Sequence, residues 1–588
     1  MSSSTMVSQS SSMYPGLIDS KPLNVSYSLM QKKRCSAIPL DREEMFLILI
    51  LSLLDKNLFK STLWPWRYSG MRYSPSVLPH RSLVESILVL QWPGALGDIC
   101  MAVPFLSILR QLFPSAKIHV LTQQPYDRIY RVSGDVDLII ENPLDKHINM
   151  LMGGDSPSLS EVYADSKRLI AHLNENAYDL LINLQVVPVS AALSKLIGAR
   201  FKIGMTLTDD GLPLLTGNTW VTYLFGVSAN LFRSFNYFHR TDIFKFLIDP
   251  YQNLVPRPQI TLTVSAMRNA QSFFDSNNIR DDDIVVGLIP LAGTPIRVWR
   301  HYGEVIRRAS SRHNIKFIVF GTSSEEQQIR NMIVDAPNTV FATRLSIEEL
   351  MAALIGCDLI ISNDTGPMHL ASLLKRPILA IFGPTSVYEV GPWGTSFTAL
   401  QSPQCASCYC QQCMNPQDYC MDVIDVDSVL NELYRMLGLG QFFSPNPNKI
   451  SRITDSTPSG SDEAAIKSFI FKYLSEKHCI LGASIDNPPD FELEGKEILN
   501  SAFKLASLVK QGISLLHSPY LNYHQLRPIH HALLNQDNPL RLIVTINELI
   551  TMDQRHGHFS NRDRLLAFYK SVEADLNLLF NSKSTKCP

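Results

Sequence analysis

The stretch Asn363-Asp-Thr-Gly-Pro-Met-His-Leu-Ala371 decides the fold, because it joins two apolar runs through a turn and a short helix. Residues 358–362 precede it and residues 377–382 follow it. Both runs are typical of short buried strands, since a continuous apolar run bounded by turn residues suits a sheet covered on both faces. Residues 368–374 are long enough for two turns of helix. The sequence therefore predicts a strand, a tight turn, a helix and a second strand.

The turn in this unit has the chemistry of an anion site. Gly366 allows a sharp backbone turn, and Pro367 suits the first helical position. The helix start then offers N–H groups and the positive end of its dipole to a phosphate. Asp364 follows the strand, where open α/β sheets place ligands. It either accepts hydrogen bonds from the sugar of a nucleotide-sugar diphosphate or caps the helix, and the residues alone leave both interpretations open.

The same alternation of strands and helices runs through most of the chain. Strands are predicted from the apolar runs at residues 86–90, 117–121, 136–140, 178–184, 283–290 and 316–320. Alternating strands and helices predict parallel sheets covered by helices on both faces. Residues 205–255 are rich in aromatics and turn residues, which favours loops and a crossing between two domains.

Composition bounds the class of protein. At 588 residues, with 45% apolar and 18% charged residues, the chain is globular and has more than one domain. A net charge of −1 argues against a nucleic-acid partner. The first thirty residues lack the apolar segment of a signal peptide. Residues 45–54 form an apolar run too short to span a bilayer, so packing on the main body is favoured over a membrane-surface contact.

The stretch around Asp364 resembles the donor-site signature of glycosyltransferase family 9, the ADP-heptose:lipopolysaccharide heptosyltransferases. The resemblance is carried by Asp364-Thr-Gly-Pro-Met-His-Leu370, then Arg376-Pro377 and Phe382-Gly-Pro-Thr385. It extends from about residue 87 to about residue 420. It implies an α/β fold of the GT-B type, with two Rossmann-like domains facing a cleft. We accordingly expect an N-terminal extension (1–80), an acceptor domain (81–255), a donor domain with a Cys-rich segment (256–442), a linker (443–462) and a helical accessory domain (463–588).

The first loop of the acceptor domain also matches the family. Gly94-Ala-Leu-Gly-Asp98 is followed by an amphipathic helix. The resemblance implies that Asp98 is the general base for the acceptor hydroxyl and that Gly97 lies on the acceptor side. A buried carboxylate with a raised pKa can do this work, but a helix N-cap is the plain alternative for Asp98. Many relatives have Lys or Arg near Gln91, so an anionic acceptor is expected to be held differently here.

The donor-domain residues follow from the same resemblance. Arg297 stands where relatives carry a lysine and would neutralise the departing diphosphate, since guanidinium binds phosphate in a bidentate way. Alternatively it is a surface residue before a core tryptophan. Glu325 or Glu326 would hold the ribose, although acidic residues also suit a helix start. Ser346 and Glu349 predict a capping box for the next helix. The remaining donor-binding residues that we expect are Thr294, Leu345, Asp364, Thr365, Gly366 and His369; Leu345 and His369 also suit plain packing roles.

Five cysteines crowd into residues 405–420. One metal could use Cys405, Cys408, Cys413 and Cys420, although the pairs are closer than usual zinc spacings. The resemblance extends to autotransporter-modifying heptosyltransferases, which hold iron with four cysteines. A structural iron or zinc ion and unligated thiols therefore remain alternatives.

The resemblance as a whole implies an inverting enzyme that transfers heptose from ADP-heptose to the lipopolysaccharide inner core, for example lipid A–Kdo. No metal is required for this chemistry, because arginine and backbone donors can stabilise the diphosphate. The expected location is cytoplasmic, with a peripheral contact at the inner membrane. Two alternatives are a protein O-heptosyltransferase, suggested by the cysteines and the extra domain, and a non-catalytic sugar-nucleotide or partner-binding module.

Overall fold

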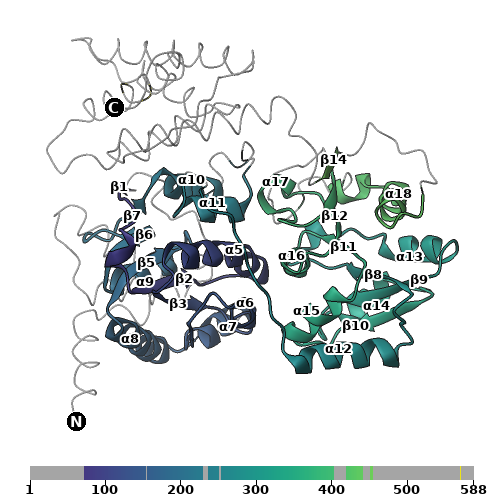
Figure 1. Ribbon diagram of the computed structural model, residues 1–588, viewed down its shortest axis with the longest axis horizontal. Helices are drawn as coiled ribbons and strands as arrows, with labels where there is room; N and C mark the ends of the chain where they lie inside the picture. Colours follow the sequence, from purple (N-terminus) through teal and green to yellow (C-terminus); the bar gives the residue numbers. More distant parts are fainter. Residues whose placement is uncertain are drawn as a thin grey trace.

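The computed structural model describes residues 72–153, 155, 157–229, 233, 236, 238–250, 253–402, 413, 419–440, 451–454, 570 and 572. Most of the expected N-terminal extension, including the apolar run at residues 45–54, lies outside these residues. The same holds for the expected accessory domain, apart from Lys570 and Val572. The described residues form two α/β units, drawn in purple to blue and in teal to green in Figure 1.

The first unit has a seven-stranded sheet in the order β1-β7-β6-β5-β2-β3-β4. All neighbouring strands are parallel except β6 and β7. The strands are β1 (Arg72–Pro75), β2 (Ser86–Gln91), β3 (Lys117–Thr122), β4 (Leu138–Ile140), β5 (Tyr178–Asn183), β6 (Ala199–Leu207) and β7 (Pro213–Gly217). The helices are α5 (Leu96–Leu112), α6 (Arg128–Ser133), α7 (Asp145–Gly153), α8 (Leu159–Glu175), α9 (Pro188–Leu196), α10 (Thr219–Ser228) and α11 (Arg240–Phe246).

The second unit has a seven-stranded sheet in the order β10-β9-β8-β11-β12-β13-β14, in which only β14 is antiparallel. The strands are β8 (Ile284–Ile289), β9 (Ile315–Phe320), β10 (Thr339–Ala342), β11 (Leu359–Asn363), β12 (Ile378–Phe382), β13 (Phe397–Gln401) and β14 (Ser451–Thr454). The helices are α12 (Val264–Ser276), α13 (Tyr302–Ser310), α14 (Glu326–Met332), α15 (Ile347–Ile355), α16 (Gly366–Leu373), α17 (Val387–Val390) and α18 (Val426–Met436), with 3-10 turns at Pro295–Arg297 and Cys420–Val423.

Both sheets reverse their strand order at one point, between β2 and β5 in the first and between β8 and β11 in the second. This is the doubly wound arrangement, in which ligands bind beyond the carboxyl ends of the strands at the reversal. The predicted unit from residue 358 to residue 382 is confirmed as β11, α16 and β12, and every residue of both strands is buried. Two such units side by side make the α/β GT-B fold that the resemblance implied.

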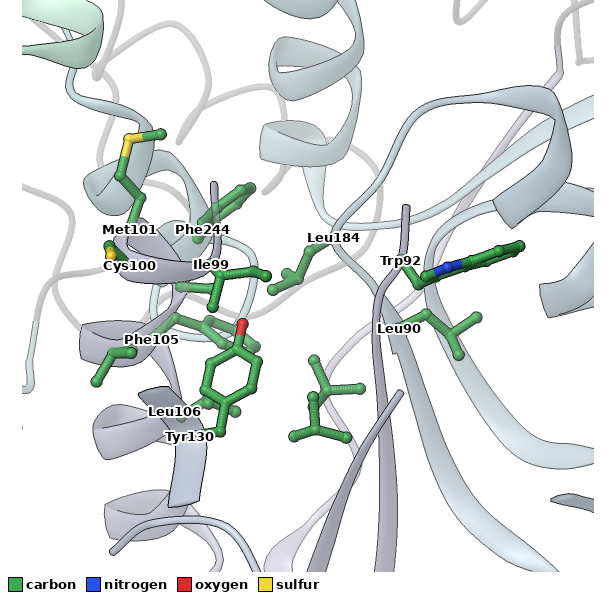
Figure 2. Packing of buried hydrophobic residues seen from close by; sticks show 14 of the residues in the cluster. Leu90, Trp92, Ile99, Cys100, Met101, Phe105, Leu106, Tyr130, Leu184 and Phe244 are labelled. Carbon is green, nitrogen blue, oxygen red and sulfur yellow. The ribbon is translucent and has the colours of Figure 1, made fainter. Parts of the chain in front are cut away.

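The core of the first unit continues into the second. One cluster of buried apolar residues includes the first sheet, α5 and one face of the second sheet. Figure 2 shows the part of it in which Ile99, Phe105 and Leu106 of α5 pack near Tyr130 and Phe244. A second cluster fills the other face of the second sheet, beneath α13 and α18.

Three segments contain regular elements that were not predicted. Residues 72–75 of the expected extension form β1, which pairs with β7. The expected loops of residues 205–255 include β7 and the helices α10 and α11. The expected linker contains β14, which pairs with β13. In each case tertiary packing supplies the partner, since α10 is buried along nearly its whole length and both short strands extend an existing sheet edge.

Candidate functional site

The candidate site lies at the strand-order reversal of the second sheet. Asp364 directly follows β11, and Arg297 ends the turn that follows β8. These two strands are hydrogen-bonded neighbours, so their carboxyl ends present both side chains at the same edge of the sheet. The nearest atoms of the Arg297 guanidinium and the Asp364 carboxylate are 3.1 Å apart.

Asn363 ties the Arg297 loop to the end of β11. Its side-chain oxygen accepts a hydrogen bond from the backbone N–H of Trp299 at 3.1 Å, and its amide donates to the carbonyl of Pro290 at 2.7 Å. Asn363 is fully buried, so both bonds are shielded from water. The loop that carries Arg297 is therefore fixed at both ends by one side chain, which explains its position beside Asp364.

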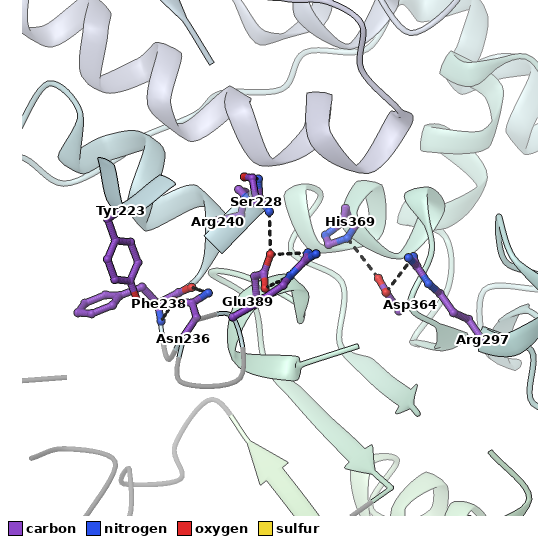
Figure 3. Close-up of polar contacts among 10 residues, drawn as sticks. Tyr223, Ser228, Asn236, Phe238, Arg240, Arg297, Asp364, His369 and Glu389 are labelled. Carbon is purple, nitrogen blue, oxygen red and sulfur yellow. Dashed lines mark hydrogen bonds and ion pairs between the residues drawn. The ribbon is translucent and has the colours of Figure 1, made fainter. Parts of the chain in front are cut away.

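Asp364 is a buried carboxylate between the side chains of Arg297 and His369 (Figure 3). Besides Arg297, its other oxygen lies 3.8 Å from Nε2 of His369. Burial alone would raise the pKa of Asp364, but the contact with His369 and the charge of Arg297 outweigh it and hold the pKa below its ordinary value. Asp364 is not the N-cap of α16, because that position belongs to Thr365. Helix capping thus does not account for this carboxylate.

The starts of two helices pack directly against each other where the two units meet. A Cβ atom on Gly97 in α5 would lie 2.8 Å from Cδ2 of His369 in α16, and one on Gly366 would lie 2.7 Å from Cβ of Leu96. Within the described residues, the side chain of the N-cap Thr365 makes no capping bond. The first-turn N–H groups of any helix lack acceptors within the helix. The first turn of α16 thus lies where the two units meet, beside the first turn of α5.

Asp98 is the third residue of α5 and is half-exposed. Its Oδ2 accepts a hydrogen bond from the backbone N–H of Ala95 at 3.2 Å. The N-cap alternative for Asp98 was wrong in detail, because Ala95 takes that position and Asp98 bonds back to it. Gln91 is fully buried and donates from Nε2 to the carbonyl of Asp98 at 3.2 Å. Its Oε1 is buried without a hydrogen-bond partner among the residues that the structure describes.

Asp145 supports this loop and was missed by sequence reasoning. Its carboxylate accepts from the indole N–H of Trp92 at 2.8 Å and from the backbone N–H of Gln124 at 2.9 Å. Trp92 follows β2 and Gln124 follows β3, so one buried side chain ties together the loops after two neighbouring strands. Asp145 begins α7, and nothing in the sequence around it indicates that it bonds to Trp92, which lies 53 positions away.

The other predicted donor residues have different surroundings. Oε2 of Glu325 accepts from the backbone N–H and the hydroxyl of Thr322, each at 2.8 Å, whereas Glu326 pairs with Arg330. Leu345 is half-buried against the shared core. In the described part of the chain, the Thr294 hydroxyl oxygen is buried and has no hydrogen-bond partner. Direct contacts join Arg297, Asp364, His369 and Gly97. Within the described residues, Glu325 and Leu345 lie apart from this group.

The cysteine segment is only partly described. Cys420 is fully buried in the second cluster and Cys413 is half-buried, while Cys405 and Cys408 lie outside the described residues. Across the described ranges, no group of three or more His, Cys, Asp or Glu residues could hold a metal ion. The proposed ligand set therefore stays a prediction. In the same ranges, no helix is both long and apolar enough to cross a bilayer.

Comparison with known proteins gives consistent matches. The model of glycosyltransferase family 9 (heptosyltransferase) matches residues 166–418, which include Arg297, Asp364 and His369 but not Asp98. The lipopolysaccharide heptosyltransferase 3 of Escherichia coli is 24% identical over 321 residues, which cover 51% of this chain and 84% of that protein. The lipooligosaccharide heptosyltransferase 2 of Campylobacter jejuni is 29% identical over 27% of this chain and 53% of its own. A solved structure of E. coli ADP-heptose lps heptosyltransferase II matches 60% of this chain and 98% of its own at 17% identity, with a TM-score of 0.44.

Proposed function

Because the model of glycosyltransferase family 9 matches residues 166–418, we propose that this chain transfers heptose from ADP-heptose to a lipopolysaccharide inner-core acceptor such as lipid A–Kdo. The observation that carries the proposal is the group formed by Arg297, Asp364 and His369 at the strand-order reversal, packed against the helix that begins beside Asp98. Such a group offers a cation and helix-start N–H groups to a diphosphate, and a carboxylate to sugar hydroxyls.

The second unit binds the donor in this proposal. The side chain of Arg297 is 34% exposed, so it can reach a ligand while remaining near Asp364. It stabilises the charge that develops on the diphosphate as the bond between the sugar carbon and the phosphate oxygen breaks. The Thr294 hydroxyl donates to the same group, and ionised Asp364 accepts hydrogen bonds from the heptose. Glu325 accepts from the ribose, and Leu345 borders the adenine.

The first unit supplies the base. Asp98 takes the proton of the acceptor hydroxyl as its oxygen attacks the anomeric carbon from the face opposite the diphosphate, so the sugar carbon is inverted and ADP leaves. The hydrogen bond from Ala95 fixes the direction of the carboxylate, and half-exposure leaves it open to an acceptor. No metal ion enters this scheme. Reaction with a lipid-linked acceptor would take place at the cytoplasmic face of the inner membrane.

The test is a transfer assay with the full chain and an Asp98→Asn variant, which has nearly the same shape but cannot accept the proton. Each is incubated with ADP-heptose and deacylated lipid A–Kdo, and ADP and product are measured by mass spectrometry. We expect product from the unchanged chain and a loss of about 10²-fold or more in kcat for the variant, with the donor Kd retained. Donor binding without product would overturn the acceptor assignment, and heptose found in a protein fraction would identify a protein acceptor. Neither binding nor product would overturn the donor assignment.

A further inference from the structure

Glu389 is a fully buried carboxylate that accepts hydrogen bonds from two arginines of the other unit. It lies on α17 in the second unit. Arg233 donates to it from Nε at 2.7 Å and from Nη2 at 2.6 Å, and Arg240 donates from Nη2 at 2.7 Å. Arg233 lies between α10 and α11 in the first unit, and Arg240 is the first residue of α11. Figure 3 shows Arg240 beside the Glu389 carboxylate, close to the pair of Asp364 and His369.

A buried carboxylate needs cationic partners, because the loss of hydration destabilises its charged form. Burial raises the pKa of Glu389, but the charges of Arg240 and Arg233 more than offset this and lower it overall. The two units therefore depend on each other at this point. If the two units moved apart, the ion pairs of Glu389 with Arg233 and Arg240 would both break.

Two further contacts join the two units near the ion cluster. Nδ1 of His239 accepts the backbone N–H of Thr241 at 3.1 Å, so Nε2 carries the hydrogen and donates to the carbonyl of Gly391 at 2.9 Å. The indole N–H of Trp393 donates to Asp242 at 3.2 Å. With Glu389 and its arginines, these contacts join the start of α11 to the segment that follows α17.

This junction is mechanically connected to both parts of the candidate site. α11 packs on α5, and the Thr241 hydroxyl donates to the carbonyl of Met101 in α5 at 3.0 Å. α5 begins beside Asp98, and its Gly97 contacts His369. On the other side, α17 follows β12, which is hydrogen-bonded to β11 ahead of Asp364. A fixed distance between α11 and α17 therefore fixes how the start of α5 meets the start of α16.

We propose that Glu389 is a positioning residue, a clamp that sets the registry of the two units and thereby the placement of Asp98 relative to Asp364. Only its kinetic consequence rests on the proposed function, since the clamp itself is measured without any substrate. The clamp predicts that the α5–α16 contact is already formed before the donor binds.

The matched control is within the same chain. Glu432 in α18 also pairs with two arginines, Arg435 and Arg452, each at 2.7 Å, but all three residues belong to the second unit. Glu389→Gln and Glu432→Gln thus remove the same charge from similar two-arginine clusters, one between the units and one within a unit. Arg240→Gln tests the partner side in case Glu389→Gln folds poorly.

The measurement is amide hydrogen exchange on the full chain without substrate, comparing the first turns of α5 and α16 with β9. We expect Glu389→Gln and Arg240→Gln to speed exchange at both helix starts by on the order of tenfold, because local opening no longer breaks a buried ion pair. The amides of β9 should exchange as fast as they do in the chain without substitutions. Glu432→Gln should leave the exchange rate of α5 unchanged. Combining Glu389→Gln with Arg240→Gln should change the free energy of local opening by less than the sum of the two single effects. Equal acceleration in β9, or no change at α5 and α16, would overturn the clamp.

A kinetic readout then connects the clamp to the reaction. Since the donor contacts lie within the second unit, Glu389→Gln should lower kcat about tenfold or more while donor KM stays within about twofold. A rise in donor KM with unchanged kcat would contradict the positioning role. If the unchanged chain shows no transfer, the proposed function fails while the exchange result still decides the clamp.

Discussion

At the level of single residues, the contact between Gly97 and His369 leaves no room for a side chain. A methyl group at position 97 would approach Cδ2 of His369 to 2.8 Å, a distance that real contacts essentially never show. Either α5 must move away from α16 or the imidazole must turn away from Asp364. Both movements disturb the group that we propose binds the donor.

Gly97→Ala should therefore lower the free energy of unfolding by about 1–3 kcal/mol, the usual cost of overpacking. Donor binding should weaken as well, because His369 is displaced from Asp364. Chemical denaturation and donor titration measure the two effects. Gly293→Ala is the control for unfolding alone, since its added methyl group would meet no described atom within 4 Å. Unchanged stability and affinity in Gly97→Ala would show that the two helix starts are not in firm contact.

The depressed pKa of Asp364 gives a pH-dependent prediction. A carboxyl group whose pKa is lower in the folded state stabilises that state above its unfolded pKa of about 3.9, and this contribution is lost as the pH falls through the folded value. Asp364→Asn should thus reduce the free energy of unfolding by about 1–3 kcal/mol at pH 7, because Arg297 and His369 lose a charged partner. The difference from the unchanged chain should shrink below about pH 4.

Urea denaturation from pH 7 to pH 3 measures this dependence for Asp364→Asn. Asp281→Asn, at an exposed position, serves as the control. A stability difference that stays constant over the whole range would show that the charge of Asp364 does not stabilise the fold.

Some site residues could be predicted from the sequence and others could not, and the difference lies in where their partners are. Asp364 and Arg297 stand in motifs that resemble a known family, and each follows a recognisable strand. Glu389 is one acidic residue between apolar neighbours, and its arginine partners lie up to 156 positions away. Asp145 is similar. Contacts of this range depend on the assembled fold, so no local pattern carries them.

At the level of elements, the start of α15 shows a prediction that local chemistry does settle. Ser346 accepts the backbone N–H of Glu349 at 3.3 Å, and the Glu349 carboxylate accepts that of Ser346 at 2.9 Å. This is the predicted capping box, and it is confirmed. All of its groups lie within four residues, so sequence alone specifies it.

Ser346→Ala should therefore cost about 1 kcal/mol in unfolding free energy, because the backbone N–H of Glu349 loses its side-chain acceptor. The chain provides a matched control in Ser158, which precedes α8 and, in the described residues, makes no capping bond with its side chain. Ser158→Ala should change stability by much less. Thermal unfolding of the two variants compares them directly, and equal effects would rule out the capping box as the cause.

Elements with weak periodicity were harder to predict. α10 is apolar on nearly every side, so it lacks the polar face that marks a surface helix. Its Trp220 packs edge-on against Tyr223 and Phe238, which together make a buried aromatic group. β14 lies in a segment rich in Pro, Ser and Asn and becomes a strand by pairing with β13. Packing and pairing partners decide both elements, and neither is visible in the local sequence.

At the level of the whole molecule, the two units share one apolar core. Alternate residues of the second sheet belong to different clusters: Phe320 and Ile360 join the core that is shared with the first unit, whereas Phe317 and Ile361 join the separate one. One face of the second sheet is thus continuous with the packing around α5. This continuity adds apolar burial to the ion cluster at Glu389, so the junction is held by more than surface contacts.

Chains of this size commonly unfold domain by domain, but the shared core predicts that the two units unfold together. Opening the first unit alone would expose the face of the second sheet that includes Phe320 and Ile360, at about 25 cal/mol for each Å² of apolar surface. Hydrogen exchange across a urea series should therefore give the same opening free energy for β2 and β5 as for β9 and β11, within about 1 kcal/mol. Glu389→Gln, which weakens the junction, should separate the two values. Earlier opening of β2 and β5 in the unchanged chain would mean that the core is divided where α5 meets α16, and the registry of Asp98 and Asp364 would then have to be set by the bound substrates instead.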